Sequence, residues 1–190
     1  IGLRQATEFA GYNQGTEADD DDIGLRLEEV DLALALFNEQ VDVGAVARSW
    51  TAVQAGVGSA AFVGVDGLTM AVDTVAIEVN QAALDSTLID FQDATAMDVV
   101  VGPDTTVTFD LADDKGEYLQ ITGNAEFDLF GLVSASGGFG VEKSSQTVTL
   151  TDGTSVATDV LTIGLSQATA FAGYNHGTEA DDDVIGLLLD

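Results

Sequence analysis

The sequence has no cysteine, one proline, one histidine and only five lysine or arginine residues in a length of 190. Without cysteine the chain can form no disulfide, no thiolate metal site and no thiol nucleophile. Nucleic-acid binding needs clustered cations that neutralise phosphates, and here the basic residues are scattered, so the sequence argues against nucleic acid as a partner. The longest apolar runs, such as AAFVGV, are too short to cross a bilayer, which argues against membrane insertion. The basic residues are Arg4, Arg26, Arg48, Lys115 and Lys143.

Residues suited to catalysis are equally scarce. The single histidine, His176, aligns with Gln14 in an internal repeat, so a general base at that position would not be shared by both copies. No Ser-His-Asp set can be assembled without this histidine. Carboxylates are so numerous that finding two of them close together carries no information about a paired-carboxylate mechanism. The sequence therefore predicts a protein that is not an enzyme.

Acidic residues, in contrast, are abundant in a chain that is also rich in apolar residues. Asp and Glu total 33, which gives a formal net charge of −28, while 46% of the residues are hydrophobic. Alternation along strands sends successive side chains to opposite faces, so we expect acidic and apolar residues to occupy different faces of a sheet. Self-repulsion of this size is relieved by cations, which suggests a salty or calcium-containing environment.

The strongest signal is a long internal repeat. Residues 1–28 align without gaps with residues 163–190, and 22 of the 28 pairs are identical. Ile1 aligns with Ile163, so the offset is 162 residues. This period is far longer than the roughly 20–50 residues of common solenoid repeats, and each unit is therefore domain-sized. We expect 1–162 to be one complete β-rich unit and 163–190 to begin the next. The chain starts with Ile1 rather than Met, and no signal peptide is visible, so we also expect it to be part of a longer protein.

Apolar–polar alternation predicts strands over most of the chain. The segment 106–111 alternates as a half-buried strand does. Asp-Gly pairs at 66–67 and 152–153 have the signature of two-residue type I′ hairpin turns, and 114–116 predicts a third turn. Leu119, Ile121, Ala125, Phe127 and Leu129 keep one parity, so we expect 119–129 to be one long strand in spite of the Gly-Asn pair inside it.

Two strands switch parity in their middle, which predicts β-bulges at 28–29 and at 73–74. The segments 38–50 and 80–91 could each hold a short helix. One proline and 21 glycines fit a β protein with many turns and close strand packing. We therefore predict an all-β fold of long antiparallel strands, arranged as a sandwich or as an elongated, partly open sheet, with at most short helices.

The repeated acidic loop, GTEADDDD in the first copy, is the first candidate site. Calcium takes six to eight oxygen ligands, mostly carboxylates and carbonyls, from flexible loops. The spacing matches neither the EF-hand nor the glycine-rich nonapeptide repeat, and the alternative is a solvated acidic turn that marks the junction between units. The candidate calcium ligands are Asn13, Glu17, Asp19, Asp20, Asp21 and Asp22 in the first copy, and Asn175, Glu179, Asp181, Asp182 and Asp183 in the second.

A specific calcium site predicts a calcium-specific gain in stability. A ligand that binds only the native state stabilises it by about 2.7 kcal/mol at a hundred times its dissociation constant. We expect millimolar Ca²⁺ to raise the melting temperature more than Mg²⁺ does, and more than NaCl does with chelator present. If NaCl at matched ionic strength stabilises equally well, the effect is screening and the site is not specific for calcium.

Three further clusters have weaker patterns. The acidic segment 110–117 reads as a charged hairpin tip or as a second oxygen-rich cluster. The glycines of SGGFG at 136–140 lack the phosphate-loop pattern and favour close strand packing. Exposed aromatic rings could bind sugars, and Trp50 is the candidate glycan-binding residue, whereas repeat-equivalent Tyr12 and Tyr174 fit packing better. The acidic side chains of the segment 110–117 are Asp110, Asp113, Asp114 and Glu117. Tyr118 is a further aromatic candidate.

Several motifs together resemble a known class of repeat. FAGYNxGTEADD, VDLALAL, RSWTAV, FVGVDGLTM and VSASGGFGVEKSSQTVTLTDGT are similar to tandem repeats of giant secreted bacterial surface proteins of the adhesin type. The resemblance covers most of the chain and implies a β-rich, acidic, extracellular or cell-surface repeat, with no catalytic residues to transfer. It leads to the expectation of a structural unit of a fibre, stalk or surface layer, whose partners are neighbouring copies that share strands. The alternative is a calcium-dependent module that binds glycans or surfaces.

Overall fold

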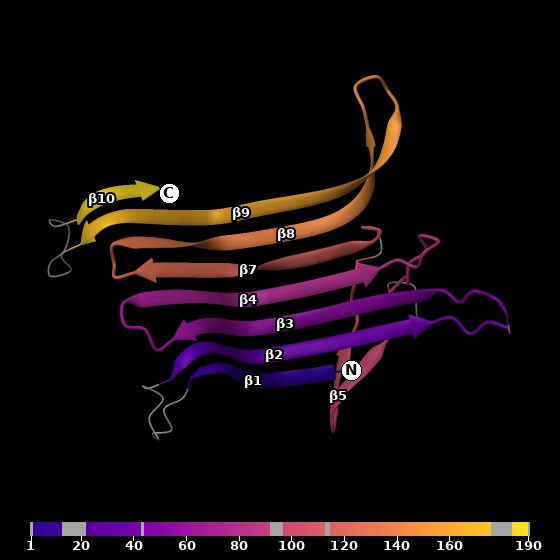
Figure 1. The fold of residues 1–190 in the computed structure, drawn as a ribbon, viewed down its shortest axis with the longest axis horizontal. Helices are drawn as coiled ribbons and strands as arrows, with labels where there is room; N and C mark the ends of the chain where they lie inside the picture. The colour runs from indigo at the N-terminus through magenta and orange to yellow at the C-terminus, as the bar shows by residue number, and fades with distance from the viewer. Residues whose placement is uncertain are drawn as a thin grey trace.

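The computed structural model describes residues 2–12, 22–42, 44–91, 97–112, 115–175 and 184–189, and in these ranges the fold is all-β (Figure 1). Eight strands form one antiparallel sheet in the order β1-β2-β3-β4-β7-β8-β9-β10, and β5 and β6 form a separate hairpin. The bounds are β1 Gly2–Tyr12, β2 Ile23–Asn38, β3 Ser49–Val63, β4 Leu68–Gln81, β5 Asp98–Gly102, β6 Thr105–Thr108, β7 Tyr118–Leu129, β8 Val133–Thr149, β9 Ser155–Asn175 and β10 Val184–Leu189.

The all-β prediction is confirmed. Of the two arrangements that the sequence predicted, the large sheet has the open one and not the sandwich. β1 and β10 are its two edges, and the two ends of the chain lie at these opposite edges (Figure 1). No helix occurs in the described residues, so the short helices considered for 38–50 and 80–91 are not present there. The first segment is instead a long loop closed by a backbone hydrogen bond from Glu39 N to Arg48 O (2.9 Å). The second is a turn in which Ala83 N donates to Thr87 O. The described residues contain no helix long and apolar enough to cross a membrane.

Both bulges predicted from parity are present. Glu29 and Thr74 have positive φ angles of 54° and 52°, and the β4–β7 register shifts between Asp73 and Ala76. The predicted strand at 119–129 is also confirmed, because β7 runs without a break through the Gly-Asn pair. The strand expected at 106–111 ends early, at Thr108, because the side chains that follow leave the hairpin and enter the core.

Of the three predicted turns, two have a different geometry from the predicted one. A type I′ turn needs positive φ at both central residues. At 66–67 and at 152–153, Gly67 (φ +74°) and Gly153 (φ +88°) have positive φ but the preceding aspartates do not. The second turn is a three-residue loop closed by Leu150 N donating to Thr154 O, in which Gly153 N also donates to Leu150 O. That is the type I turn followed by a left-handed glycine. The third turn contains Gly116 (φ +71°), and part of it lies outside the described residues.

A small core lies where the β5–β6 hairpin packs on one face of the sheet. Ala33 and Ala52 from β2 and β3 are 0% and 1% exposed. Phe109 and Leu111, which follow β6, are buried with them, and the ring of Phe91 lies 5.4 Å from that of Phe109. The residues packed around this core are Ala35, Phe37, Ile89, Met97, Val99 and Val107. The rest of the sheet has no second layer among the described residues.

The register separates charge from apolar surface, as the composition suggested. Leu32, Ala55, Ile77, Ile121 and Val141 are paired in a single row across β2, β3, β4, β7 and β8. The adjacent row is Ala33, Gln54, Glu78, Gln120 and Glu142, and it points to the other face because neighbouring residues alternate. We call the first the apolar face and the second the acidic face. The small core and the β5–β6 hairpin are on the acidic face.

The apolar face continues across the bulges. There the alternation shifts by one residue, which keeps Phe62, Met70 and Phe127 on the same face as the Ile77 row. Among the residues of β2, β3, β4, β7 and β8 on this face outside the bulges, Lys143 is the only charged one. They include Leu25, Val30, Leu34, Val53, Phe62, Met70, Val72, Val75, Ile77, Val79, Leu119, Ile121, Phe127, Phe139 and Val141.

Candidate functional site

The two edges of the sheet are built from the two copies of the sequence repeat. In the first copy Gly11 pairs with Gly24, and in the second Gly173 pairs with Gly186, which is the same register at an offset of 162. The β1–β2 pairs from Glu8↔Leu27 to Tyr12↔Ile23 recur as Ala170↔Leu189 to Tyr174↔Ile185. Gln5 and its equivalent Gln167 also share an unusual positive φ, of 48° and 49°. The repeat is therefore one hairpin that occurs at both edges.

A phenylalanine covers the glycine pair in each of these hairpins. A Cβ built on Gly11 would lie 2.8 Å from Cζ of Phe9, and one on Gly24 would lie 3.0 Å from it. In the second copy, a Cβ built on Gly186 would lie 2.6 Å from Cε2 of Phe171. The ring therefore occupies the space that side chains would take on the paired strands, a known way of stabilising glycine in a sheet. This contact explains why the repeated sequence combines this Phe with these glycines.

The two copies differ in what lies on their other side. β9 has β8 as a second partner, with Val133↔Ala172, Phe139↔Leu165 and Val141↔Ile163 among the pairs. β1 is an edge strand, so within the described residues its outer backbone groups have no strand to pair with. An unpaired edge of this length is a template for another strand.

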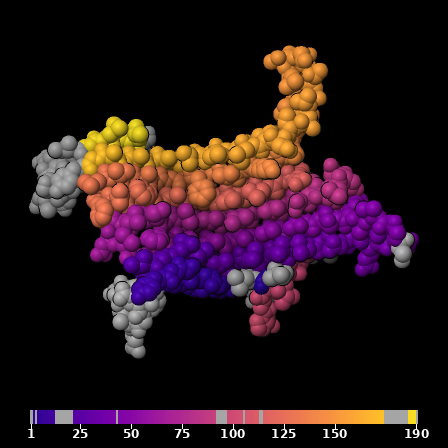
Figure 2. Space-filling model, viewed as in Figure 1, coloured from indigo at the N-terminus to yellow at the C-terminus, as the bar shows by residue number. Residues whose placement is uncertain are grey.

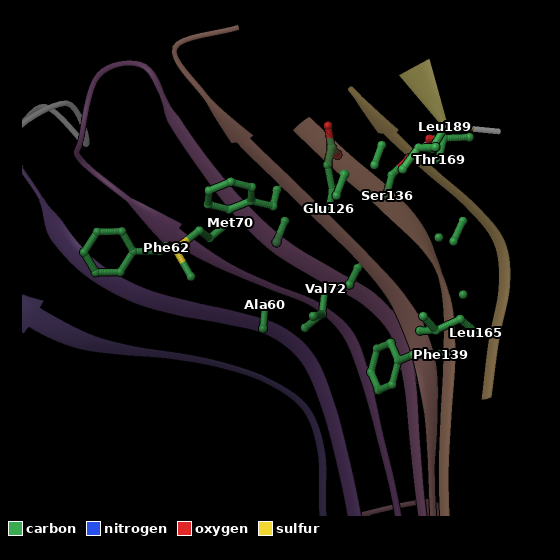
Figure 3. A pocket seen from close by; sticks show the side chains of 18 of the residues that line it. Ala60, Phe62, Met70, Val72, Glu126, Ser136, Phe139, Leu165, Thr169 and Leu189 are labelled. Atoms are coloured by element: carbon green, nitrogen blue, oxygen red, sulfur yellow. The ribbon is translucent and has the colours of Figure 1, made fainter. Parts of the chain in front are cut away.

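The apolar face is hollowed into a groove of about 800 Å³ where the strands bend. Phe62, Met70, Val72 and Phe139 lie around it in Figure 3, together with Leu165 of β9. Met70 is 48% exposed and Leu165 is 75% exposed, so large apolar side chains face solvent here. A surface of this kind suits contact with another apolar surface rather than chemistry on a bound molecule.

The acidic face has a smaller, open hollow of about 520 Å³ near the same bend. Thr74, Thr122 and Asn124 supply hydroxyl and amide groups on one side of it, and Asn124 donates to Asp73 Oδ1 (2.9 Å). Hydrogen bonds from Thr74 and Asn124 lower the pKa of Asp73. The residues of β8 and β9 that line it include three glycines, which have no side chain to fill it. Those glycines are Gly138, Gly140 and Gly164.

A polar cluster anchors β7 on the acidic face. The hydroxyl of Tyr118, which is 2% exposed, donates to Glu78 Oε2 (3.0 Å) and accepts from Ala112 N (3.1 Å). Lys115 Nζ lies 5.1 Å from the Tyr118 ring centroid and 3.2 Å from Glu142 Oε2. Every one of these groups has a protein partner, which is the pattern of a structural network rather than of a reactive site.

Removing the Tyr118 hydroxyl tests this network. Burial raises the pKa of Tyr118 above its usual value near 10, so the unfolded chain loses its proton first and stability falls as pH rises past about 10. Tyr118→Phe leaves the Ala112 N–H and the Glu78 carboxylate without this partner, and we expect a loss of about 1–3 kcal/mol at pH 8. Urea unfolding at pH 8 and pH 11 measures both effects. A variant that matches the parent at pH 8, and loses as much stability at pH 11, would contradict this account.

Trp50 is engaged by residues of two loops. It is the second residue of β3 and is half-buried, and its Nε1 donates to Thr87 O in the segment that follows β4 (2.9 Å). The guanidinium of Arg48 lies 5.3 Å from the ring centroid and is held by Glu39 (2.7 Å), whose pKa this arginine lowers. The ring predicted to bind glycans thus has its N–H bonded and an arginine stacked against it. Of the other aromatic candidates, Tyr118 is buried, whereas Tyr12 is 66% exposed.

Asp22 is the predicted calcium ligand whose side chain the structure describes. It is 8% exposed, and its Oδ2 lies 3.9 Å from Arg26 Nη2. The others, Asn13, Glu17, Asp19, Asp20, Asp21, Glu179, Asp181, Asp182 and Asp183, lie outside the described residues, as do Asp113, Asp114 and His176. Asn175 is the last residue of β9. In the part of the chain that is described, no group of three or more His, Cys, Asp or Glu side chains could hold a metal ion.

Two of the three glycines of SGGFG, Gly137 and Gly138, pack closely as the sequence suggested, whereas Gly140 does not. A Cβ on Gly137 would lie 2.7 Å from Cα of Ala168, and one on Gly138 would clash with Oγ of Ser166. The sequence did not single out Gly140 and Gly164, which line the hollow on the acidic face, although the equivalence of Gly2 and Gly164 was visible in the alignment. It also could not identify which strands are edges.

No protein-family model matches the chain, and no curated protein or solved structure is similar to it at a significant level. The geometry defines a class of protein with one open antiparallel sheet and matching hairpins at its two edges.

Proposed function

We propose that this chain is a structural repeat of an extracellular bacterial fibre, stalk or surface layer, in which adjacent units share strands and form one continuous sheet. The observation that carries the proposal is β9. Its first residues, 155–162, complete one unit, and its remaining residues, 163–175, are the equivalent of β1 in the next. A single strand thus belongs to two units.

The β8–β9 register specifies how a preceding unit would pair with β1. Subtracting 162 from Leu165 and Ala172 gives Leu3 and Ala10, so these residues would pair with Phe139 and Val133 of the preceding copy. All of the pairs are antiparallel, and the contact is between different edges of the two units. Such a heterologous contact generates an open-ended filament when the rotation between successive units does not close into a ring.

The apolar face supports a second, lateral contact between copies in the same fibre. Five strands about 4.8 Å apart, each with about a dozen residues rising about 3.4 Å, cover roughly 1,000 Å². A stable protein–protein interface needs about 800 Å² on each partner. Pairing two apolar faces would leave both acidic faces outside, which suits a chain with a net charge of −28. The composition, the repeat and the resemblance described above support an extracellular location.

The test is the assembly state of two shortened chains. Residues 29–190 contain one full period with the repeated hairpin at the C-terminal end, and residues 29–162 lack that hairpin altogether. We expect the first to assemble head to tail and the second to be unstable. A fully folded, monomeric 29–162 would overturn strand sharing.

A further inference from the structure

The β5–β6 hairpin covers a glycine of the edge strand. Val101 and Val99 of β5 lie over Gly2 of β1, where a Cβ would clash with Cγ1 of Val101 and would lie 3.1 Å from Cγ1 of Val99. Gly2 pairs with Ala33, which belongs to the core beneath the same hairpin. Glycine weakens a strand unless another backbone or side chain approaches closely, and here that approach is visible.

The repeat-equivalent of Gly2 has no such neighbour. A Cβ on Gly164 would meet nothing within 4 Å, although this glycine is inside β9. Its cross-strand partner is Gly140 of β8, where a Cβ would meet only Cγ2 of Thr122 at 3.8 Å. Both glycines line the open hollow of about 520 Å³ on the acidic face. Two adjacent glycines therefore keep free a space that nothing in this unit fills.

The hairpin itself extends past the sheet. In Figures 1 and 2, β5 crosses the sheet near the start of β1 and projects beyond the β1 edge. Val100 is 72% exposed, and Pro103 and Asp104 at the tip are exposed too. A strand advances about 3.4 Å per residue and strands lie about 4.8 Å apart, so the two residues after Val101 reach over the next strand position. In an array, that position belongs to β8 of the preceding unit.

We infer that the β5–β6 hairpin is a clasp across the seam between units: Val101 covers Gly2, which is Gly164 of the preceding unit, and the hairpin tip fills the hollow over Gly140 of that unit. The inference rests on the proposed function, because it needs the continuous sheet. It adds a contact on the acidic face to the backbone pairing along the seam. Pro103 at the tip has no backbone N–H that the contact would leave unpaired. The threonine, serine and asparagine groups of the hollow can bond the tip carbonyls.

A tandem protein tests the clasp directly. It consists of residues 1–162 followed by a second full copy, 1–190, so it contains one complete seam. The chain has no cysteine, which allows a single engineered disulfide to report the contact. We expect Gly140→Cys in the first copy and Pro103→Cys in the second to form a disulfide under mild oxidation, detected on a non-reducing gel. The reversed arrangement, with Gly140→Cys in the second copy and Pro103→Cys in the first, places the two cysteines at opposite ends and should give none.

A valine series supplies a second readout that does not depend on disulfide geometry. Gly140→Val in the first copy fills the hollow at the seam, so we expect it to lower the urea midpoint of the tandem protein. The same substitution in the second copy, or in the 190-residue chain, faces open space and should leave the midpoint unchanged.

The outcomes separate the two proposals. The clasp is overturned if the tandem protein unfolds in one transition but shows no selective cross-link and no difference between the two valine positions. The proposal of a shared sheet then stands. Two units that unfold independently, with the stability of the single chain, overturn the proposed function and the clasp with it.

Discussion

Residues 29–190 are expected to form head-to-tail chains whose length grows with concentration. This segment lacks β1 and the first part of β2, so the edge of β3 that pairs through Leu25↔Phe62 and Leu27↔Ala60 is open. At its other end it retains the hairpin of 163–190, which has the sequence and register of the missing part. One copy therefore supplies the hairpin that the next copy lacks. This is strand addition to an exposed edge, in which main-chain hydrogen bonds supply affinity and alternate side chains supply specificity.

Sedimentation and negative-stain electron microscopy measure this assembly, and the full chain supplies its control. In residues 1–190 the β3 edge is already filled by the chain's own hairpin, so head-to-tail growth should stop at a discrete species. The full chain can still donate its C-terminal hairpin to one neighbour. We therefore expect a small fraction of it to shorten assemblies of 29–190, as a chain stopper does. Aggregates that ignore the added full chain, or a monomeric 29–190, would contradict strand sharing.

The elements that the sequence predicted well are those determined by local pattern. Parity switches around Glu29 and Thr74 were readable because leucines, valines and isoleucines flank them on both sides. The equivalent irregularity at Gln5 was not predicted, because small and polar residues surround it and give no clear alternation. The strand at 106–111 was overextended for a tertiary reason. Phe109 N donates to Met97 O, and Phe109 and Leu111 are drawn into the core under the hairpin.

The candidate surfaces depend on how the strands are arranged in space and not on the local alternation of residues. The sequence could therefore indicate the alternatives but could not choose between them. A strand with one apolar side has the same alternation in a sandwich and in an open sheet, which is why both were predicted. The repeat at 162 residues indicated neighbouring copies. It could not show that the two copies lie at opposite edges. Side chains of β5 cover Gly2, whereas nothing covers the equivalent Gly164. This difference is likewise visible only in three dimensions.

The second large effect is expected on the apolar face, where Met70→Lys should prevent lateral pairing of two copies. Met70 is 48% exposed in the single chain, so a lysine there can extend into water and should cost the monomer little. In a paired sheet the same cation would be buried without a counter-charge, which costs several kcal/mol. Because about 1.4 kcal/mol corresponds to a tenfold change, we expect the dissociation constant of the pair to rise at least about 100-fold.

Thr69→Lys is the matched control, since Thr69 is the preceding residue of β4 and points to the acidic face. It pairs with Asp128, so a lysine there gains a nearby carboxylate and should leave pairing intact. Salt distinguishes this contact from charge-driven association. Packed sheets lie about 10 Å apart, so the two acidic faces are separated by more than the Debye length of about 10 Å at 0.1 M salt. Raising NaCl should therefore change the affinity little, whereas Met70→Lys should weaken it at least about 100-fold. Equal effects of the two lysine substitutions on the sedimentation profile would show that the apolar face is not the contact surface.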